Sequence, residues 1–306
     1  MFDLSKDTIL VRIRIRQPSG KRKDEQSSTE TADRHGADAD YVSTYISTLP
    51  KEDRMTYQTI GTEARNWFDE QTVVWDNTGW RLVSVKEYER IRQELEQRKA
   101  KFLEAAHALI LRLPQIRKQL MQRGEKGCLG GLVDHVRLPE RAEMQRAFAF
   151  QIETAAIANP KDLRLSHISA AAAKKIGEEI RQEQAAKVQD ALRQVIERIR
   201  ETVSAIARQA CGEIEVADER TGEKSYRPAN FKDSLIENAR SLVAVIPGIN
   251  ITNDPFIAKI AKEMEEKLCP IEATDVRKEP AKRPEVAKKA LSILERLKSG
   301  AVTAKV

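Results

Sequence analysis

The sequence has few of the residues that build β-rich folds. Only 5% of its residues are aromatic and 13 of its 306 residues are glycine, whereas 33% are charged. This composition is typical of long, solvent-facing helices and argues against a β-sandwich or a dinucleotide-binding enzyme. The hydrophobic share of 41% is nevertheless enough for a core, so the chain as a whole is not disordered. We expect an elongated, mainly α protein.

Cysteine is scarce, and long apolar runs are missing. Cys128, Cys211 and Cys269 are far apart, and none belongs to a CxxC pair. This pattern supports neither a disulfide framework nor a zinc site, so we expect reduced thiols. No run approaches the roughly 18 apolar residues of a membrane span, and the start MFDLSKDT lacks the features of a signal peptide. These absences predict a cytoplasmic protein without a membrane partner.

Recognisable catalytic motifs are missing as well. The glycine-rich stretch 123–135 does not match GxxxxGK[ST], the four histidines lack HExxH spacing, and no GxSxG occurs. We therefore expect neither an enzyme nor a cofactor. The alternative is a metal-dependent nuclease or hydrolase that uses Asp38, Asp40 or Asp134, with His35 beside the first two. Turn and capping roles explain these aspartates more simply.

Positive charge is concentrated near the two ends of the sequence. Residues 9–23 carry six basic groups and no acid. Residues 277–306 carry nine basic and three acidic groups, a surplus of six. Because the surplus of each of these two segments alone equals the chain's net charge of +6, the remainder must be net acidic. Two basic ends on an acidic body indicate anionic partners, either nucleic acid or an acidic protein surface.

Short β signals lie in the first half of the chain. ILVRIRIR, residues 9–16, alternates with a period of two and predicts a half-buried strand with its arginines on the outer face. Residues 17–40 are polar and aperiodic, which predicts a flexible loop, and a short helix should follow near 41–48. The turn DNTG between two β-prone runs predicts a hairpin over 72–83. A further strand near 148–157 could pair with the first one.

Helical periodicity dominates the remainder. The longest seam covers about 169–210 and predicts a coiled-coil-like helix that packs on a partner, which could be the helix at 86–113 or another protomer. We thus expect long antiparallel helices with a small β element. Three regions follow: a mixed α/β part (1–160), a helical part (161–276) and a basic tail helix (277–306).

The basic residues are the candidate binding site. Arginines two positions apart on one strand face are about 6.5–7 Å apart, close to the phosphate repeat of a stretched single strand. An edge strand that charge keeps soluble, and a solvated helix face in the tail, are the alternatives. Neither basic region contains an aromatic residue, so a salt-sensitive backbone contact is the most that we expect. The candidates are Arg12, Arg14, Arg16, Lys21, Arg22, Lys23, Lys282, Arg283, Lys288 and Lys289.

Several motifs together resemble an uncharacterised family, a domain of unknown function from bacteriophages and mobile elements. They are ILVRIRIR with SGKRK, RHGAD at 34–38, LPKE with QTIGTEAR at 58–65, WDNTGWRL, and FKDSLIENARSLVAVIPGINITNDP at 231–255. The resemblance covers nearly the whole chain. Its members tend to be encoded near a MoxR-type or cobaltochelatase-like AAA+ ATPase and a von Willebrand A-domain protein, which implies an accessory of an ATPase-driven system in a bacterial host cell.

Two hypotheses follow. In the first, a non-enzymatic phage or mobile-element protein binds nucleic acid or a partner AAA+ ATPase through its basic ends. In the second, a structural or assembly protein forms a homo-oligomer through its long helices, and the basic ends only neutralise acidic surfaces.

Overall fold

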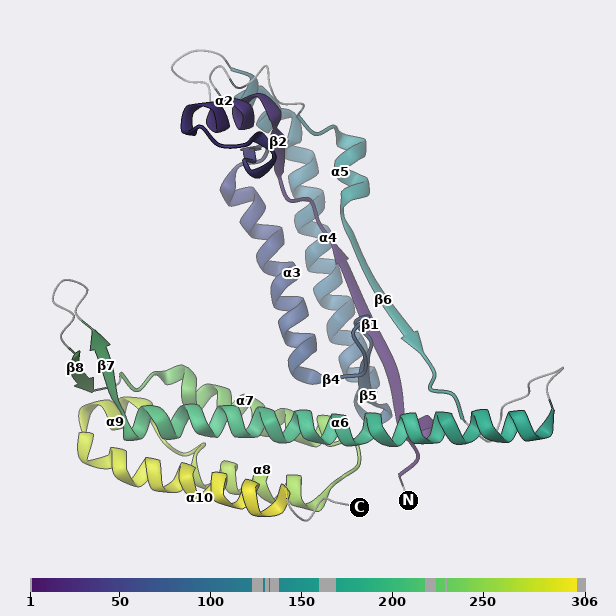
Figure 1. Cartoon of the computed structure of the whole chain (residues 1–306), viewed down its shortest axis with the longest axis vertical. Coiled ribbons are helices and arrows are strands. Elements are labelled where there is room, and N and C mark those ends of the chain that lie inside the picture. The colour runs from purple at the N-terminus through teal and green to yellow at the C-terminus, as the bar shows by residue number, and fades with distance from the viewer. Residues whose placement is uncertain are drawn as a thin grey trace. The chain divides into compact units, whose positions relative to one another are not determined.

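The structure of the protein is a computed structural model that describes residues 2–122, 129, 132, 138–159, 169–217, 224–228 and 230–301. Helices make up most of these residues, and the strands among them form a small sheet and two strand pairs (Figure 1). The expected mainly α class is therefore confirmed. None of the helices in these ranges combines the length and apolar character that crossing a membrane requires.

The chain forms two compact units, each assembled from separated segments. Unit 1 contains residues 1–11, 69–89 and 154–306, and unit 2 contains residues 12–68 and 90–153. Four elements contribute residues to both units: β1 (Thr8–Arg16), α3 (Lys51–Gln71), α4 (Val85–Met121) and β6 (Ala149–Ala155).

Unit 1 is built around the second half of α6 (Ala170–Cys211), which packs against α7 and α10. Its buried positions recur every three or four residues and include Ala191, Val195, Ile199, Val203 and Ile206. Helices α7 and α10 occupy the apolar seam of this half of α6. The prediction that the helix at 86–113 packs here, one of the two that we considered, is therefore wrong. The other helical elements here are α1 (Leu4–Asp7), α7 (Asp233–Ile249), α8 (Pro255–Lys267), α9 (Ala273–Lys278), η3 (Pro280–Lys282) and α10 (Arg283–Ala301).

The four-stranded sheet has the order β4-β5-β1-β6. In unit 1, residues Thr8–Val11 of β1 pair antiparallel with β5 (Arg81–Ser84), which also pairs with β4 (Val73–Val74). The predicted N-terminal strand, the 72–83 hairpin and the strand near 148–157 beside the first strand are all confirmed. The antiparallel strands β7 (Glu213–Ala217) and β8 (Lys224–Pro228) form a separate pair.

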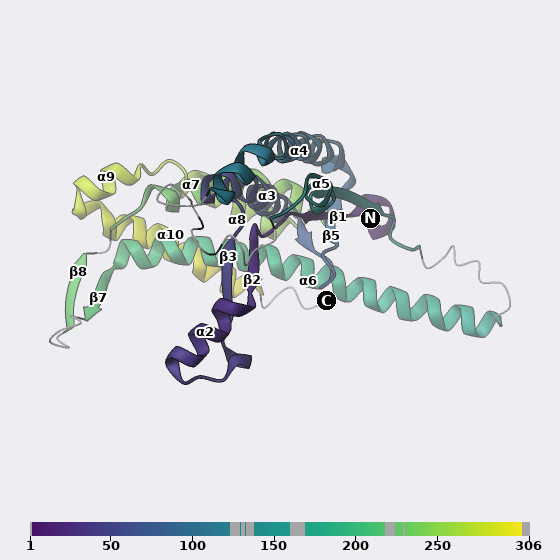
Figure 2. The ribbon, with the colours of Figure 1, turned by 90° about the horizontal axis from the view of Figure 1, so that it is seen from above.

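Unit 2 contains a separate core between α3 and α4, which lie side by side in both views (Figures 1 and 2). Tyr57 of α3 and Phe102 of α4 contact Phe148, with ring centroids 5.0 and 5.9 Å apart. Phe148 lies between α5 (Arg141–Ala147) and β6. Helix α4 continues through Pro114 to Met121.

The flexible loop predicted over residues 17–40 is wrong. This stretch contains β2 (Lys21–Asp24), α2 (Glu25–His35) and η1 (Ala39–Tyr41), and β3 (Thr44–Ser47) replaces the helix expected at 41–48. Asp24 caps the start of α2, and Gly36, with φ of 61°, ends it in the left-handed conformation. Helix α2 buries only Ser28 and Ala32, so hydrophobic periodicity could not reveal it.

Candidate nucleic-acid interface

Each of the three arginines of β1 contacts an acceptor within unit 2. The side chain of Arg12 is only 14% exposed, and its Nε donates to Glu153 Oε2 at 2.9 Å. Arg14 is 57% exposed and lies 3.4 Å from the same carboxylate. Arg16 donates to the carbonyl of Arg146 at 2.7 Å. Arg14 and Arg16 are thus exposed on the expected outer face, whereas Arg12 is partly covered beside Glu153.

Strands β2 and β3 form an antiparallel ribbon with two different faces (Figure 2). Arg22 lies opposite Ile46, which is buried, and its guanidinium forms an ion pair with Glu143. Asp24, the next residue on this face, is also buried. Directly opposite residues share a face and successive residues alternate, so this inner face belongs to the interior of unit 2.

The outer face of the ribbon carries Lys21, Lys23 and Tyr45. Lys23 lies directly opposite Tyr45, and Lys21 lies opposite Ser47. Both lysines are exposed, and Tyr45 retains 59% of its accessible surface. Two cations and one aromatic ring are thereby brought together on a face of only four strand positions. We call this set the ribbon face.

Acidic residues lie on the other elements of this region. Helix α2 carries Glu25, Glu30 and Asp33, and the following turn carries Asp38 and Asp40. The hydroxyl of Ser28 on α2 accepts the backbone N–H of Thr44 at 2.8 Å, and Thr44 belongs to the inner face. Helix α2 therefore contacts the ribbon at Thr44, whereas Lys21 and Lys23 lie on the opposite face.

Two of the four basic candidates in the tail form ion pairs. Lys282 lies 3.1 Å from Glu279, and Lys289 lies 2.8 Å from Glu285. Arg283 and Lys288 instead line a cavity of about 730 Å³ beside the end of α6. The four tail candidates therefore do not form one continuous basic patch.

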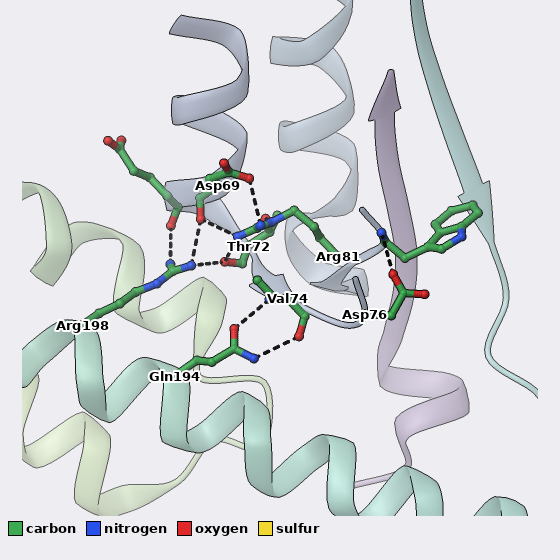
Figure 3. Close-up of polar contacts among 9 residues, drawn as sticks. Asp69, Thr72, Val74, Asp76, Arg81, Gln194 and Arg198 are labelled. Atoms are coloured by element: carbon green, nitrogen blue, oxygen red, sulfur yellow. Dashed lines mark hydrogen bonds and ion pairs between the residues drawn. The ribbon is translucent and has the colours of Figure 1, made fainter. Parts of the chain in front are cut away.

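A second polar cluster, in unit 1, joins α6 to residues 69–74 (Figure 3). Arg198 donates to the carbonyls of Asp69, Glu70 and Thr72 at 2.9, 3.1 and 2.8 Å. Arg81 reaches the Asp69 carboxylate at 2.8 Å. Burial lowers the pKa of both arginines, while the carboxylate of Asp69 opposes that shift. Acceptors of residues 69–72 thus surround both guanidinium groups, which supports a structural role for the cluster as a joint between α6 and this segment.

The hairpin turn beside that joint is held by one carboxylate. Asp76, which Figure 3 labels, lies in this turn. Its carboxylate accepts the backbone N–H groups of Thr78 and Trp80 at 2.9 and 3.2 Å. Partial burial raises the pKa of Asp76, but the hydrogen bonds from Thr78 and Trp80 and the charge of Lys187 outweigh it and lower the pKa overall. Gly79, with φ of 92°, completes the turn.

The candidates for metal chemistry are not brought together. The carboxylate of Asp38 accepts the N–H of Asp40 at 3.0 Å and caps η1, which confirms the turn-and-cap interpretation. Within the described ranges, no three ligand-type side chains gather into a metal cluster. Asp134, with the glycine-rich stretch around it, lies outside the described residues, as do His135 and His167.

Sequence reasoning missed Tyr45. The basic stretch at residues 21–23 contains no aromatic residue, and only strand pairing brings Tyr45 beside Lys23. The β-prone run Thr44–Ser47 could have indicated this strand, but four residues are too few for a clear period-two pattern.

Comparison with known proteins adds no relative. No protein-family model matches the chain, and neither a curated protein nor a solved structure matches it.

Proposed function

We propose that the protein is a non-enzymatic nucleic-acid-binding protein that contacts its ligand through the ribbon face. The juxtaposition of Lys21, Lys23 and the exposed Tyr45 carries this proposal. The two lysines are about 6.5–7 Å apart along the strand, which matches successive phosphates of an extended strand. The ring of Tyr45 offers a surface on which a base can stack.

The chemistry favours single-stranded ligands. Stacking on an aromatic ring needs an unpaired base and accepts any of the four bases, because every base has a π face. The lysines act as point charges on the backbone and carry no sequence information. Binding should therefore be weakly sequence-selective and steeply dependent on salt.

The test is fluorescence anisotropy with labelled single- and double-stranded DNA of one sequence, at about 50 and 200 mM salt. The variant Lys21→Ala/Lys23→Ala should flatten the slope of log affinity against log salt by about 1.4 for the single strand, since each phosphate contact contributes about 0.7. Tyr45→Ala should weaken single-strand binding by about 1–3 kcal/mol and leave the slope unchanged.

Lys101→Ala/Lys118→Ala is the matched control. It removes the same charge from exposed positions of α4 in the same unit. If both double variants lost the same DNA affinity, the effect would come from net charge and not from the ribbon face. No binding by the unaltered protein would reject the ribbon face as a nucleic-acid site.

The resemblance to a mobile-element family adds a biological setting to this proposal. An accessory protein that holds nucleic acid could present it to a MoxR-type AAA+ ATPase and its von Willebrand A-domain companion in the bacterial cytoplasm. The ATPase-binding alternative is tested by pull-down with the candidate ATPase, using the same ribbon-face variants.

Assembly through α6 is the second candidate function. The spacing of Ile176 and Ile180 continues the hydrophobic seam upstream of Ala191, yet both side chains are only half-buried. A coiled-coil contact with another protomer would cover them. Light scattering of Ile176→Asp/Ile180→Asp tests this, and an unchanged oligomer would exclude that half of the helix as the contact.

A further inference from the structure

The exposed stripe of α10 has a charge pattern that is complementary to itself. Pro284, Lys288, Leu291 and Glu295 follow one another at spacings of four, three and four residues and therefore lie along one side of the helix. All four line the cavity beside the end of α6, together with Ala210 and other residues. We call these four residues the α10 stripe.

The described residues of unit 1 neither bury the apolar side chain of the α10 stripe nor pair its charges. Leu291 retains 45% of its accessible surface, although it lies between helical turns that are buried on their opposite side at Ala290 and Ile293. Lys288 and Glu295 are exposed, and the described residues give neither of them an ion pair. By contrast, the neighbouring Lys289 and Arg296 of the same helix are paired within unit 1.

The order of charges along the stripe selects a second copy of the chain. Lys288 lies three residues before Leu291, and Glu295 lies four residues after it. When two such helices run antiparallel about a two-fold axis close to Leu291, Lys288 of each copy faces Glu295 of the other. On each helix the cation and the anion are about 10 Å apart along the axis. The dimer therefore contains two identical ion pairs, one at each end of the contact.

We infer that the α10 stripe is a homodimer contact in which Leu291 packs on its symmetry mate between two reciprocal Lys288–Glu295 ion pairs. The second α10 packs across the cavity beside the end of α6, which Ala210 and Ala287 also line. This contact is separate from the upstream half of α6 and does not depend on nucleic-acid binding.

Charge reversal tests the contact, with sedimentation equilibrium of the full chain in the absence of nucleic acid as the measurement. Lys288→Glu places two carboxylates against each other at each end of the contact, and Glu295→Lys places two ammonium groups there. Each single reversal should weaken dimerisation by about tenfold or more. The double variant Lys288→Glu/Glu295→Lys restores opposite charges and should recover the affinity of the unaltered protein.

The rescue makes the test specific. Neither residue forms an ion pair within the described part of unit 1, so circular dichroism should show unchanged folding in all three variants. A monomeric protein at the highest attainable concentration would overturn the inference. So would a dimer that both single reversals leave intact, or a double variant no better than the single ones.

Discussion

Substitution of Arg198 should destabilise unit 1. Its guanidinium satisfies three backbone carbonyls at residues 69–72, the last of which follows directly on the end of α3. Arg198→Ala leaves the Glu70 carbonyl to water, whereas the carbonyls of Asp69 and Thr72 keep hydrogen bonds from Arg81. A hydrogen bond to a charged donor contributes about 1.5–3 kcal/mol, and partial rehydration reduces the sum of three, so we expect a loss of about 3 kcal/mol.

Arg193→Ala is the matched control on the same helix. Its side chain is 76% exposed, and its one ion pair is with Asp190, three residues away on the helix. We expect a loss of about 0.5 kcal/mol or less, since exposed helical pairs contribute little. Arg198→Lys should lie between the two, because an ammonium group keeps the charge but cannot fork over three carbonyls.

Urea unfolding followed by tryptophan fluorescence is the assay. Trp75 and Trp80 belong to unit 1 and Trp67 to unit 2, so a Trp67→Phe background makes the signal report on unit 1. With an m-value of about 3 kcal/mol/M, the loss for Arg198→Ala corresponds to a midpoint about 1 M lower. Equal midpoints for the Arg198→Ala and Arg193→Ala proteins would refute the structural role of the joint.

Two further predictions concern unit 2. Burial raises the pKa of Tyr57 to about 12, so the unfolded state releases this proton first, and stability present below pH 10 should fall as the pH rises towards 12. Alkaline urea titrations should show that Tyr57→Phe removes about 2–3 kcal/mol of this pH dependence. Arg12→Met should lower the free energy of unfolding by about 1–3 kcal/mol, because the partly buried Glu153 loses its less exposed cation and keeps the more distant Arg14. Arg14→Met should cost at most about 1 kcal/mol, and equal effects would contradict the assigned partners.

Local signals in the sequence were reliable where one short segment decides the structure. The alternation at residues 9–16 predicted β1, and the turn around Asp76 and Gly79 predicted the β4–β5 hairpin. In both cases the stabilising contacts involve neighbours in the chain or one face of a strand.

Pairings between distant segments could not be predicted in the same way. The charged run of β2 has low β propensity, and it becomes a strand only through its pairing with β3. The contact between Arg12 and Glu153 joins residues 141 positions apart, so no periodicity indicates it. The seam of α6 specified an apolar face but not the helix that covers it, because any helix with a matching face would satisfy the same pattern.

The candidate site shows the same division. Sequence identified the basic residues 21–23 correctly as a concentration of charge, yet it placed the arginines of β1 at the centre of the interface. The structure gives Arg12 and Arg22 to carboxylates of unit 2 and leaves Lys21 and Lys23 outward. Which basic side chains stay exposed depends on which of them meet acidic side chains from later segments of the chain.

The interleaving of the two units determines how the protein can be made and dissected. The chain passes between the units four times, at residues 11/12, 68/69, 89/90 and 153/154. The core of unit 1 joins Leu4 and Leu10 to residues as distant as Leu297. A growing chain can therefore complete unit 2 while most of unit 1 is still unsynthesised, and unit 1 must then close over a long sequence separation, which is slow. No cut at a single position yields two fragments that each retain a whole core.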